Sequence, residues 1–184
     1  MQRIGVGLVL VVLAAALAAR LEAAEADPAA PGVGPQTAVV TSLDGDGWLL
    51  ATDPTNVGRA EKWFAAARPD ARPTRVPWII QDVFPGYHGV AWYWREFTPP
   101  AHPMPGGRYL LRFWAVDYTA EVWLGGVRVG AHEGGETPFE LDVTDALRPG
   151  AANLLAVRVL NPTHEPIDGI VLNQTPHRNK AMPY

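Results

Sequence analysis

The chain has 184 residues, no cysteine and a formal net charge of −4 at pH 7. Its 15 lysines and arginines form no basic stripe and are outnumbered by 19 acidic residues, which argues against a nucleic-acid partner. Behind a predicted N-terminal leader, about 150 residues remain, which is enough for one ordinary domain with a hydrophobic core.

The N-terminus has the pattern of a secretory signal peptide. An arginine at position 3 precedes an apolar run over residues 4–19, and small residues suited to cleavage follow as far as Ala26. The run is shorter than the about 20 apolar residues of a membrane-spanning helix; the alternative is an uncleaved anchor. We expect a signal peptide at 1–26, no membrane span after its cleavage, and a secreted or periplasmic protein. Without disulfides, a bacterial envelope fits at least as well as a eukaryotic secretory route.

The segment that follows is predicted to be a linker, residues 27–40, leading into one domain over residues 41–184. Its alanines, prolines and glycines are typical of a connection rather than of a packed element. In the domain, a short strand is expected at Trp48–Thr52. Turn residues from Asp53 to Asn56 then favour a helix over about Val57–Ala67. A proline-containing loop and a short buried segment at residues 78–80 follow.

Strands dominate the rest of the chain. Gly125-Gly126 separates two apolar runs and predicts a tight hairpin, because both positions of such a turn need positive φ. One helical turn is expected at residues 144–147. About seven or eight strands and one short helix indicate an all-β fold, an antiparallel β-sandwich of the jelly-roll kind. The predicted strands are Val90–Phe97, Arg108–Val116, Ala120–Leu124, Val127–Val129, Phe139–Val143 and Asn153–Leu160.

Alternation within strands predicts which faces are buried. Leu155, Val157 and Val159 share one face of the last strand, so Arg158 is expected on the face nearer to water. Within the predicted strand Val90–Phe97, Arg95 lies on the same face as Tyr93 and Phe97. If it points inward it needs a carboxylate, either Asp117 or Glu121.

The stretch HEGG, residues 132–135, interrupts the strand pattern and is a candidate for a metal or catalytic site. His132-Glu133 begins like the zinc motif HExxH, but position 136 is a glutamate, so the second histidine is missing. Glu133 and Glu136 form an acid/base pair only if the loop brings them together; exposed loop carboxylates are the more common case. The two glycines suit backbone angles that other residues avoid. The sequence predicts no metal site, no cofactor and no catalytic residue.

Seven tryptophans are many for this length. Aromatic faces bind sugar rings, so Trp92, Trp94, Trp114 and Trp123 are candidates for a carbohydrate platform. The stronger expectation is that these strand tryptophans are core residues, because large aromatic side chains dominate buried packing. Trp63 is expected to anchor the predicted helix against the sheet.

Three stretches resemble the N-terminal sugar-binding domain of glycoside hydrolase family 2, which includes β-galactosidases, β-glucuronidases and β-mannosidases. They are YHGVAWYWREF, RYLLRFWAVDYTAEVWLGGVRVGAHEGGETPFELDVTDAL and NLLAVRVLNP. The motifs GVAWY, AVDYTAEVWLGG, HEGGETPFELDVT and LAVRV come in the family's order, and the resemblance spans roughly residues 48–180. Gly125-Gly126 departs from the family's usual Asn-Gly, although both pairs suit the same turn.

The resemblance implies a galactose-binding-like jelly roll that is not itself catalytic. In the family a TIM barrel, which takes about 250 residues, supplies the catalytic carboxylates. The resemblance also implies two partners, which are carbohydrate and a downstream catalytic domain of the same polypeptide. The candidate pocket-lining residues are His132, Glu133, Gly134, Gly135, His88, His177 and Arg178. We also expect the natural chain to continue past Tyr184, because residues 161–184 form a long tail without a predicted strand. A free-standing carbohydrate-binding module and a purely structural sandwich are the alternatives.

Overall fold

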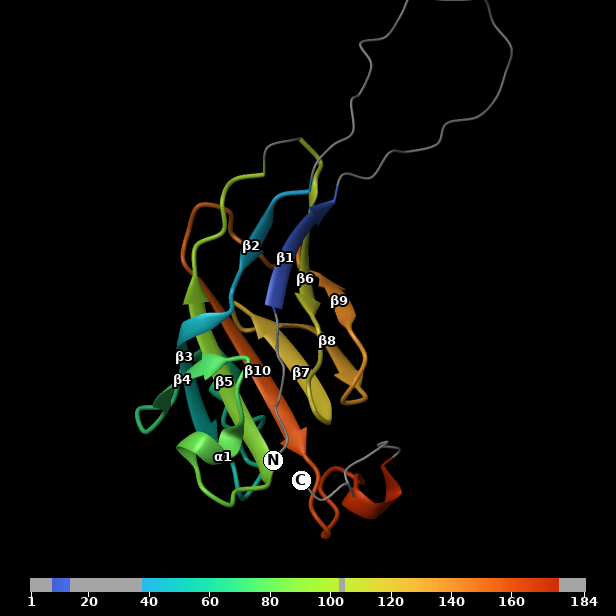
Figure 1. The fold of residues 1–184 in the computed structure, drawn as a ribbon. Coiled ribbons are helices and arrows are strands. Elements are labelled where there is room, and N and C mark those ends of the chain that lie inside the picture. Colours follow the sequence, from blue (N-terminus) through green and yellow to red (C-terminus); the bar gives the residue numbers. More distant parts are fainter. Residues whose placement is uncertain (1–7, 14–37, 103–104, 176–184) are drawn as a thin grey trace, which may run out of the picture.

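Two antiparallel sheets pack face to face in the computed structural model, which describes residues 8–13, 38–102 and 105–175 (Figure 1). The four-stranded sheet has the order β2-β1-β6-β9, and the six-stranded sheet has the order β4-β3-β5-β10-β7-β8. The elements are β1 (Leu8–Leu13), β2 (Val40–Ser42), β3 (Gly45–Thr52), η1 (Trp63–Ala65), β4 (Arg72–Val76), α1 (Ile80–Val83), β5 (Gly89–Phe97), β6 (Arg108–Phe113), β7 (Thr119–Leu124), β8 (Val127–Glu133), β9 (Phe139–Asp142), β10 (Asn153–Asn161) and η2 (Leu172–Gln174). The predicted β-sandwich is confirmed.

The main core lies between the two sheets. Alternate residues of β6, namely Tyr109, Leu111 and Phe113, are buried there, and they face residues such as Tyr93 and Val157 of the six-stranded sheet. The predicted hairpin is also present, since β7 and β8 join through Gly125 and Gly126, both at positive φ. Period-two alternation thus placed most strands and one buried face correctly.

A second hydrophobic cluster covers the opposite face of the six-stranded sheet. Trp92, Trp94 and Trp123 are all buried in it, which confirms the core assignment for these tryptophans. Trp114 differs, because 49% of its surface is exposed. Residues of the segment 63–71 pack over the cluster, and so do the isoleucines of the loop that follows β10. The central strands β5 and β10 are therefore buried on both faces.

The helix expected at Val57–Ala67 is wrong. The segment forms turns and only a 3₁₀ turn at η1, because Lys62 adopts a left-handed backbone (φ 57°) that a helix cannot continue through. The turn chemistry was read correctly: the Asp53 carboxylate accepts hydrogen bonds from the amides of Val57 and Gly58, both at 2.9 Å. The α-helix that the structure shows is instead α1, one turn that begins at the buried Ile80.

Trp63 anchors this segment as expected, although from η1 rather than from a longer helix. Its carbonyl accepts a hydrogen bond from Trp94 Nε1 at 2.8 Å, and its ring lies 6.3 Å from that of Trp92. Trp92 Nε1 in turn donates to Asp53 Oδ2 at 3.1 Å. Gly58 allows this approach, because a Cβ atom there would lie 2.4 Å from Trp92 Nε1. The segment 63–71, which covers this face, is thus fixed to the sheet by polar as well as apolar contacts.

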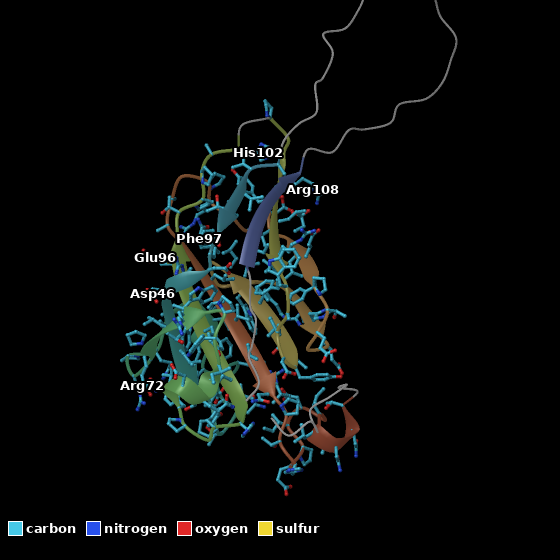
Figure 2. All side chains as sticks on the ribbon, in the orientation of Figure 1. Asp46, Arg72, Glu96, Phe97, His102 and Arg108 are labelled. Carbon is cyan, nitrogen blue, oxygen red and sulfur yellow. The ribbon has the colours of Figure 1, made fainter. Side chains whose placement is uncertain are left out.

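Three further expectations are corrected. Arg158 was expected near water but is only 2% exposed, because the segment around Trp63 lies over its face of β10. Arg95 pairs with neither Asp117 nor Glu121. It donates instead to the backbone carbonyl of Asp46, a residue labelled in Figure 2. The proline-containing loop contains β4, which is an edge strand and therefore tolerates a proline.

β1 is a strand that the sequence did not predict. Leu8–Leu13 pairs antiparallel with both β2 and β6, in the interior of the four-stranded sheet. Figure 1 shows it in dark blue between these two strands. The same residues belong to the predicted signal peptide.

The second cluster gives a test that compares two tryptophans. Trp92→Ala removes a fully buried ring and its bond to Asp53, so we expect a loss of about 3–5 kcal/mol in the free energy of unfolding. Trp114→Ala truncates a half-exposed ring and should change it by about 0.5 kcal/mol or less. Urea unfolding followed by circular dichroism measures both. Equal losses would contradict the division into buried and exposed tryptophans.

Candidate functional site

A cavity of about 310 Å³ opens on the outer face of the six-stranded sheet, beside the second hydrophobic cluster. Its walls come from β7, β8 and β10, from the turn after β3, and from the loop after β10. It is lined by Arg59, Thr119, Ala120, Glu121, Ala131, His132, Glu133, Arg158, Leu160, Asp168 and Ile170. Its volume lies at the lower end of the range of small-molecule sites.

Arg158 is the central charge of this site. It is opposite Glu121 of β7 in the register of the sheet, and its Nη1 lies 3.3 Å from Glu121 Oε2. Its Nη2 donates at 2.6 Å to Asn56 Oδ1 and at 2.6 Å to Asp168 Oδ2. A buried guanidinium stays charged and needs such partners. The pairing therefore holds the turn after β3 and the loop after β10 against the sheet.

Arg59 is the second cation and is more open to solvent. Its side chain is 39% exposed, and it pairs with Asp168 and, at 3.7 Å, with Glu121. Arg128 also approaches Glu121, at 3.5 Å, but it does not line the cavity. The two carboxylates thus each face two or more arginines, and we call the set Arg59, Glu121, Arg158, Asp168 and Asn56 the charged clasp.

The clasp keeps Asp168 ionised. Burial raises the pKa of Asp168, but the hydrogen bond from Asn56 and the charges of Arg158 and Arg59 outweigh burial, so the net pKa is lowered. Asp168 also has a positive φ of 52°, which is uncommon for a residue with a side chain. This carboxylate is therefore suited to accept hydrogen bonds and unsuited to donate a proton near neutral pH.

His132 and Glu133 line this cavity, and they end β8 rather than forming a loop. The His132 ring stacks on Phe139 at 4.3 Å between centroids, and its Nε2 lies 2.9 Å from Thr137 Oγ1. Glu133 Oε1 accepts a hydrogen bond from Tyr118 OH at 3.0 Å. Burial raises the pKa of Tyr118, and the bond to Glu133 raises it further.

Gly134 and Gly135 make the turn that follows, and the predicted backbone role is confirmed for Gly134. Gly134 has φ 123°, a region that other residues avoid, and its amide donates to the carbonyl of Tyr118 at 2.9 Å. At Gly135 a Cβ atom would lie 2.6 Å from Asp117 Oδ1. The two glycines allow the close turn that leaves Glu133 at the cavity.

Of the remaining candidates, His88 does not line the cavity. His88 is exposed, and its Nδ1 lies 3.1 Å from Asn161 Nδ2, outside the cavity lining. His177 and Arg178 lie outside the described residues. Within the part of the chain that is described, there is no group of three or more potential metal-ligating side chains and no helix long and apolar enough to cross a membrane.

Sequence reasoning missed most of the charged clasp. The sequence predicts Glu121 only as a candidate partner for Arg95, and it predicts Arg158 only as a residue near water. Their positions in apolar strands were the available signal, because a charge in a strand buried on both faces needs a partner. Arg59 and Asp168 lie in turns, where charged residues are common and carry no such signal.

The charged clasp predicts a large cost for removing one partner. Glu121→Ala leaves Arg158 under-compensated in a buried position, so we expect about 3–5 kcal/mol of destabilisation. Glu140→Ala breaks the Arg112–Glu140 pair, whose two side chains are each 38% exposed, and should cost about 0–1 kcal/mol. Chemical denaturation of both variants measures the difference, and similar small losses would show that the clasp is not structural.

Asp168 should make stability depend on pH in the acid range. Because its folded pKa is lowered, its contribution is present above the unfolded pKa of about 3.9 and is lost as pH falls through the folded value. The stability gap between wild type and Asp168→Asn should therefore be constant above about pH 5 and shrink below about pH 4. Asp145→Asn, at an exposed position outside the cavity, is the control. A gap that does not change with pH would contradict the assigned ion pairs.

Comparison with known proteins agrees with this architecture. The family described as glycosyl hydrolases family 2, sugar binding domain, matches residues 78–176. The β-glucuronidase of Paenibacillus borealis is 34% identical over 119 residues, which are 62% of this chain and 20% of that protein. The β-glucuronidase of Canis lupus familiaris is 35% identical over 109 residues, 54% of this chain and 17% of that protein.

Solved structures give the same result. The Ruminococcus gnavus β-glucuronidase superimposes with a TM-score of 0.61 at 30% sequence identity, covering 66% of this chain and 21% of that chain. The present chain thus spans about a fifth of the length of the relatives it matches. Since the family match extends over more than half of the residues, this protein belongs to the sugar-binding domain family of glycoside hydrolase family 2.

Proposed function

We propose that this chain is the non-catalytic sugar-binding domain of an exported, β-glucuronidase-like exo-β-glycosidase. The observation that carries the proposal is the restriction of the similarity to about a fifth of each glucuronidase. Export is proposed from the leader pattern of residues 1–26. The catalytic domain would be a partner within the same polypeptide.

The cavity is the part of this domain best suited to contact a carbohydrate. Sugar hydroxyl groups both donate and accept hydrogen bonds, and the cavity offers arginine donors beside carboxylate acceptors. Leu160, Ala131 and Ile170 add apolar surface for the C–H faces of a sugar ring. Arg59 is the donor that a ligand reaches most easily, because more than a third of its side chain is exposed.

The electrostatics of the clasp favour binding over catalysis. Glycoside hydrolysis by the retaining route needs two carboxyl groups about 5 Å apart, one of them an acid whose pKa is raised. Asp168 has a lowered pKa, and Glu121 is held by arginines. We therefore assign the hydrolysis of a terminal β-linked sugar to residues outside this chain.

A free-standing carbohydrate-binding module is the second candidate, and the mass of the native polypeptide distinguishes the two. This chain has a mass of 19.9 kDa. A native polypeptide several times heavier supports the enzyme proposal, and assays on chromogenic β-glucuronides and β-galactosides then follow. A native mass near 20 kDa rejects the enzyme and leaves the module. N-terminal sequencing of the mature protein tests the leader, with a start after Ala26 expected.

Sugar contact at the cavity is tested by comparing two arginines that both pair with Glu121. Arg59→Ala removes a donor that lines the cavity, so binding of a β-glucuronide should weaken about tenfold or more, equivalent to about 1.4 kcal/mol. Arg128→Ala removes a more exposed arginine outside the lining and should change binding less than about twofold. Saturation-transfer NMR titrations measure both. Equal weakening by the two variants would reject the cavity as the contact.

A further inference from the structure

Trp114 is an exposed aromatic ring that takes no part in the cavity. All seven tryptophans lie in the described residues, and Trp114 is the one that is exposed rather than buried or half-buried. It directly follows β6, where Leu111 and Phe113 are buried in the main core, so alternation directs Trp114 to the outer side of the four-stranded sheet. The cavity opens on the outer face of the other sheet. The ring and the cavity therefore lie on opposite sides of the sandwich.

Two charged side chains hold the Trp114 ring in place. The guanidinium of Arg112 lies over it, with Cζ 5.2 Å from the ring centroid, and covers one face of the indole. Glu140 of β9 is opposite Arg112 in the register and fixes it, since Arg112 Nε and Nη2 lie 2.6 Å and 2.5 Å from Glu140 Oε1. Within the described residues, Arg112 Nη1 and Glu140 Oε2 have no hydrogen-bond partner. A donor and an acceptor thus remain beside the open face of the ring.

The same face carries a second ion pair further along β6. Arg108 pairs there with Asp142 of β9. The whole set is called the outer strip: Arg108, Arg112, Trp114, Glu140 and Asp142. It follows one strand for about 20 Å, because strand residues are spaced by about 3.3 Å. Its two arginines and two carboxylates give a formal charge of zero, so it attracts neither an anionic nor a cationic polymer, whereas its donors and acceptors suit hydroxyl groups.

We propose that the outer strip binds a neutral, ribbon-like glycan of the β-1,4-glucan class, with one sugar ring stacked on Trp114. In such a chain the hydroxyl groups are equatorial, so each ring presents C–H groups on its faces and hydroxyl groups along its edges. The electron-rich face of the indole attracts the C–H groups, and the ion pairs of the strip pair with the hydroxyl groups. All residues of the site lie within 108–142. The site goes beyond the proposed function, because it shares no residue with the cavity.

Binding of cellohexaose to the full 184-residue chain tests the site. Saturation-transfer NMR titrations give the affinity, and circular dichroism confirms that each variant is folded. Trp114→Ala should weaken binding about tenfold or more, because the stacking surface is lost. Trp78→Ala is the matched control, since Trp78 also lies under an arginine, with Arg75 Cζ 3.4 Å from its ring, but lies outside the strip. It should change binding less than about twofold. In fluorotryptophan-labelled protein, the fluorine resonance that Trp114→Phe removes should shift saturably with the sugar.

Each outcome decides the proposal. Weakened cellohexaose binding in Trp114→Ala but not in Trp78→Ala supports the outer strip. Equal binding by wild type and Trp114→Ala, or no binding by wild type, overturns it. The acidic hexamer of α-1,4-galacturonate is a second probe, and tighter binding of this hexamer than of cellohexaose overturns the neutral ligand class. Arg59→Ala should leave cellohexaose binding at Trp114 unchanged, so failure of this site and failure of the cavity contact are distinguishable.

Discussion

A guanidinium buried in the sheet is the constraint on which the arrangement of this domain depends. Arg158 projects from β10 onto a face otherwise filled by tryptophans, and it is 2% exposed. Because its charge cannot be removed near neutral pH, it requires acceptors from other elements. Glu121 comes from the neighbouring strand, while Asn56 and Asp168 come from two loops that lie far apart in the sequence. The network that satisfies one charge thereby also builds the walls of the cavity.

Burial on both faces of the sheet explains why Trp92, Trp94 and Trp123 do not form a sugar-binding platform. The main core fills one face of β5 and β10, and the cover around Trp63 fills the other. Large rings fill the space beneath the segment around Trp63, and the indole N–H groups of Trp92 and Trp94 donate to Asp53 and to a backbone carbonyl. The end of the sheet beside the charged clasp differs, because arginines and carboxylates line the cavity there in place of aromatic rings.

The charges of the clasp and the family relationship are both consistent with the proposed non-catalytic role of this domain. Asp168, which arginines hold ionised, is a poor proton donor, whereas fixed donors and acceptors around a cavity are suited to orient hydroxyl groups. A domain that matches about a fifth of a glucuronidase is consistent with such a supporting role.

The sequence by itself determined what depends on neighbouring residues. It located most strands, the Gly125-Gly126 hairpin and the glycine turn after Glu133, because alternation and positive φ are local properties. Its resemblance to a known family determined the fold class. The tertiary structure decided which strand faces are covered, which elements β1 joins, and which charges meet. Arg158 and Asn56 are 102 residues apart, and no local preference specifies a contact at that separation; only the packing of the completed sheets brings such residues together.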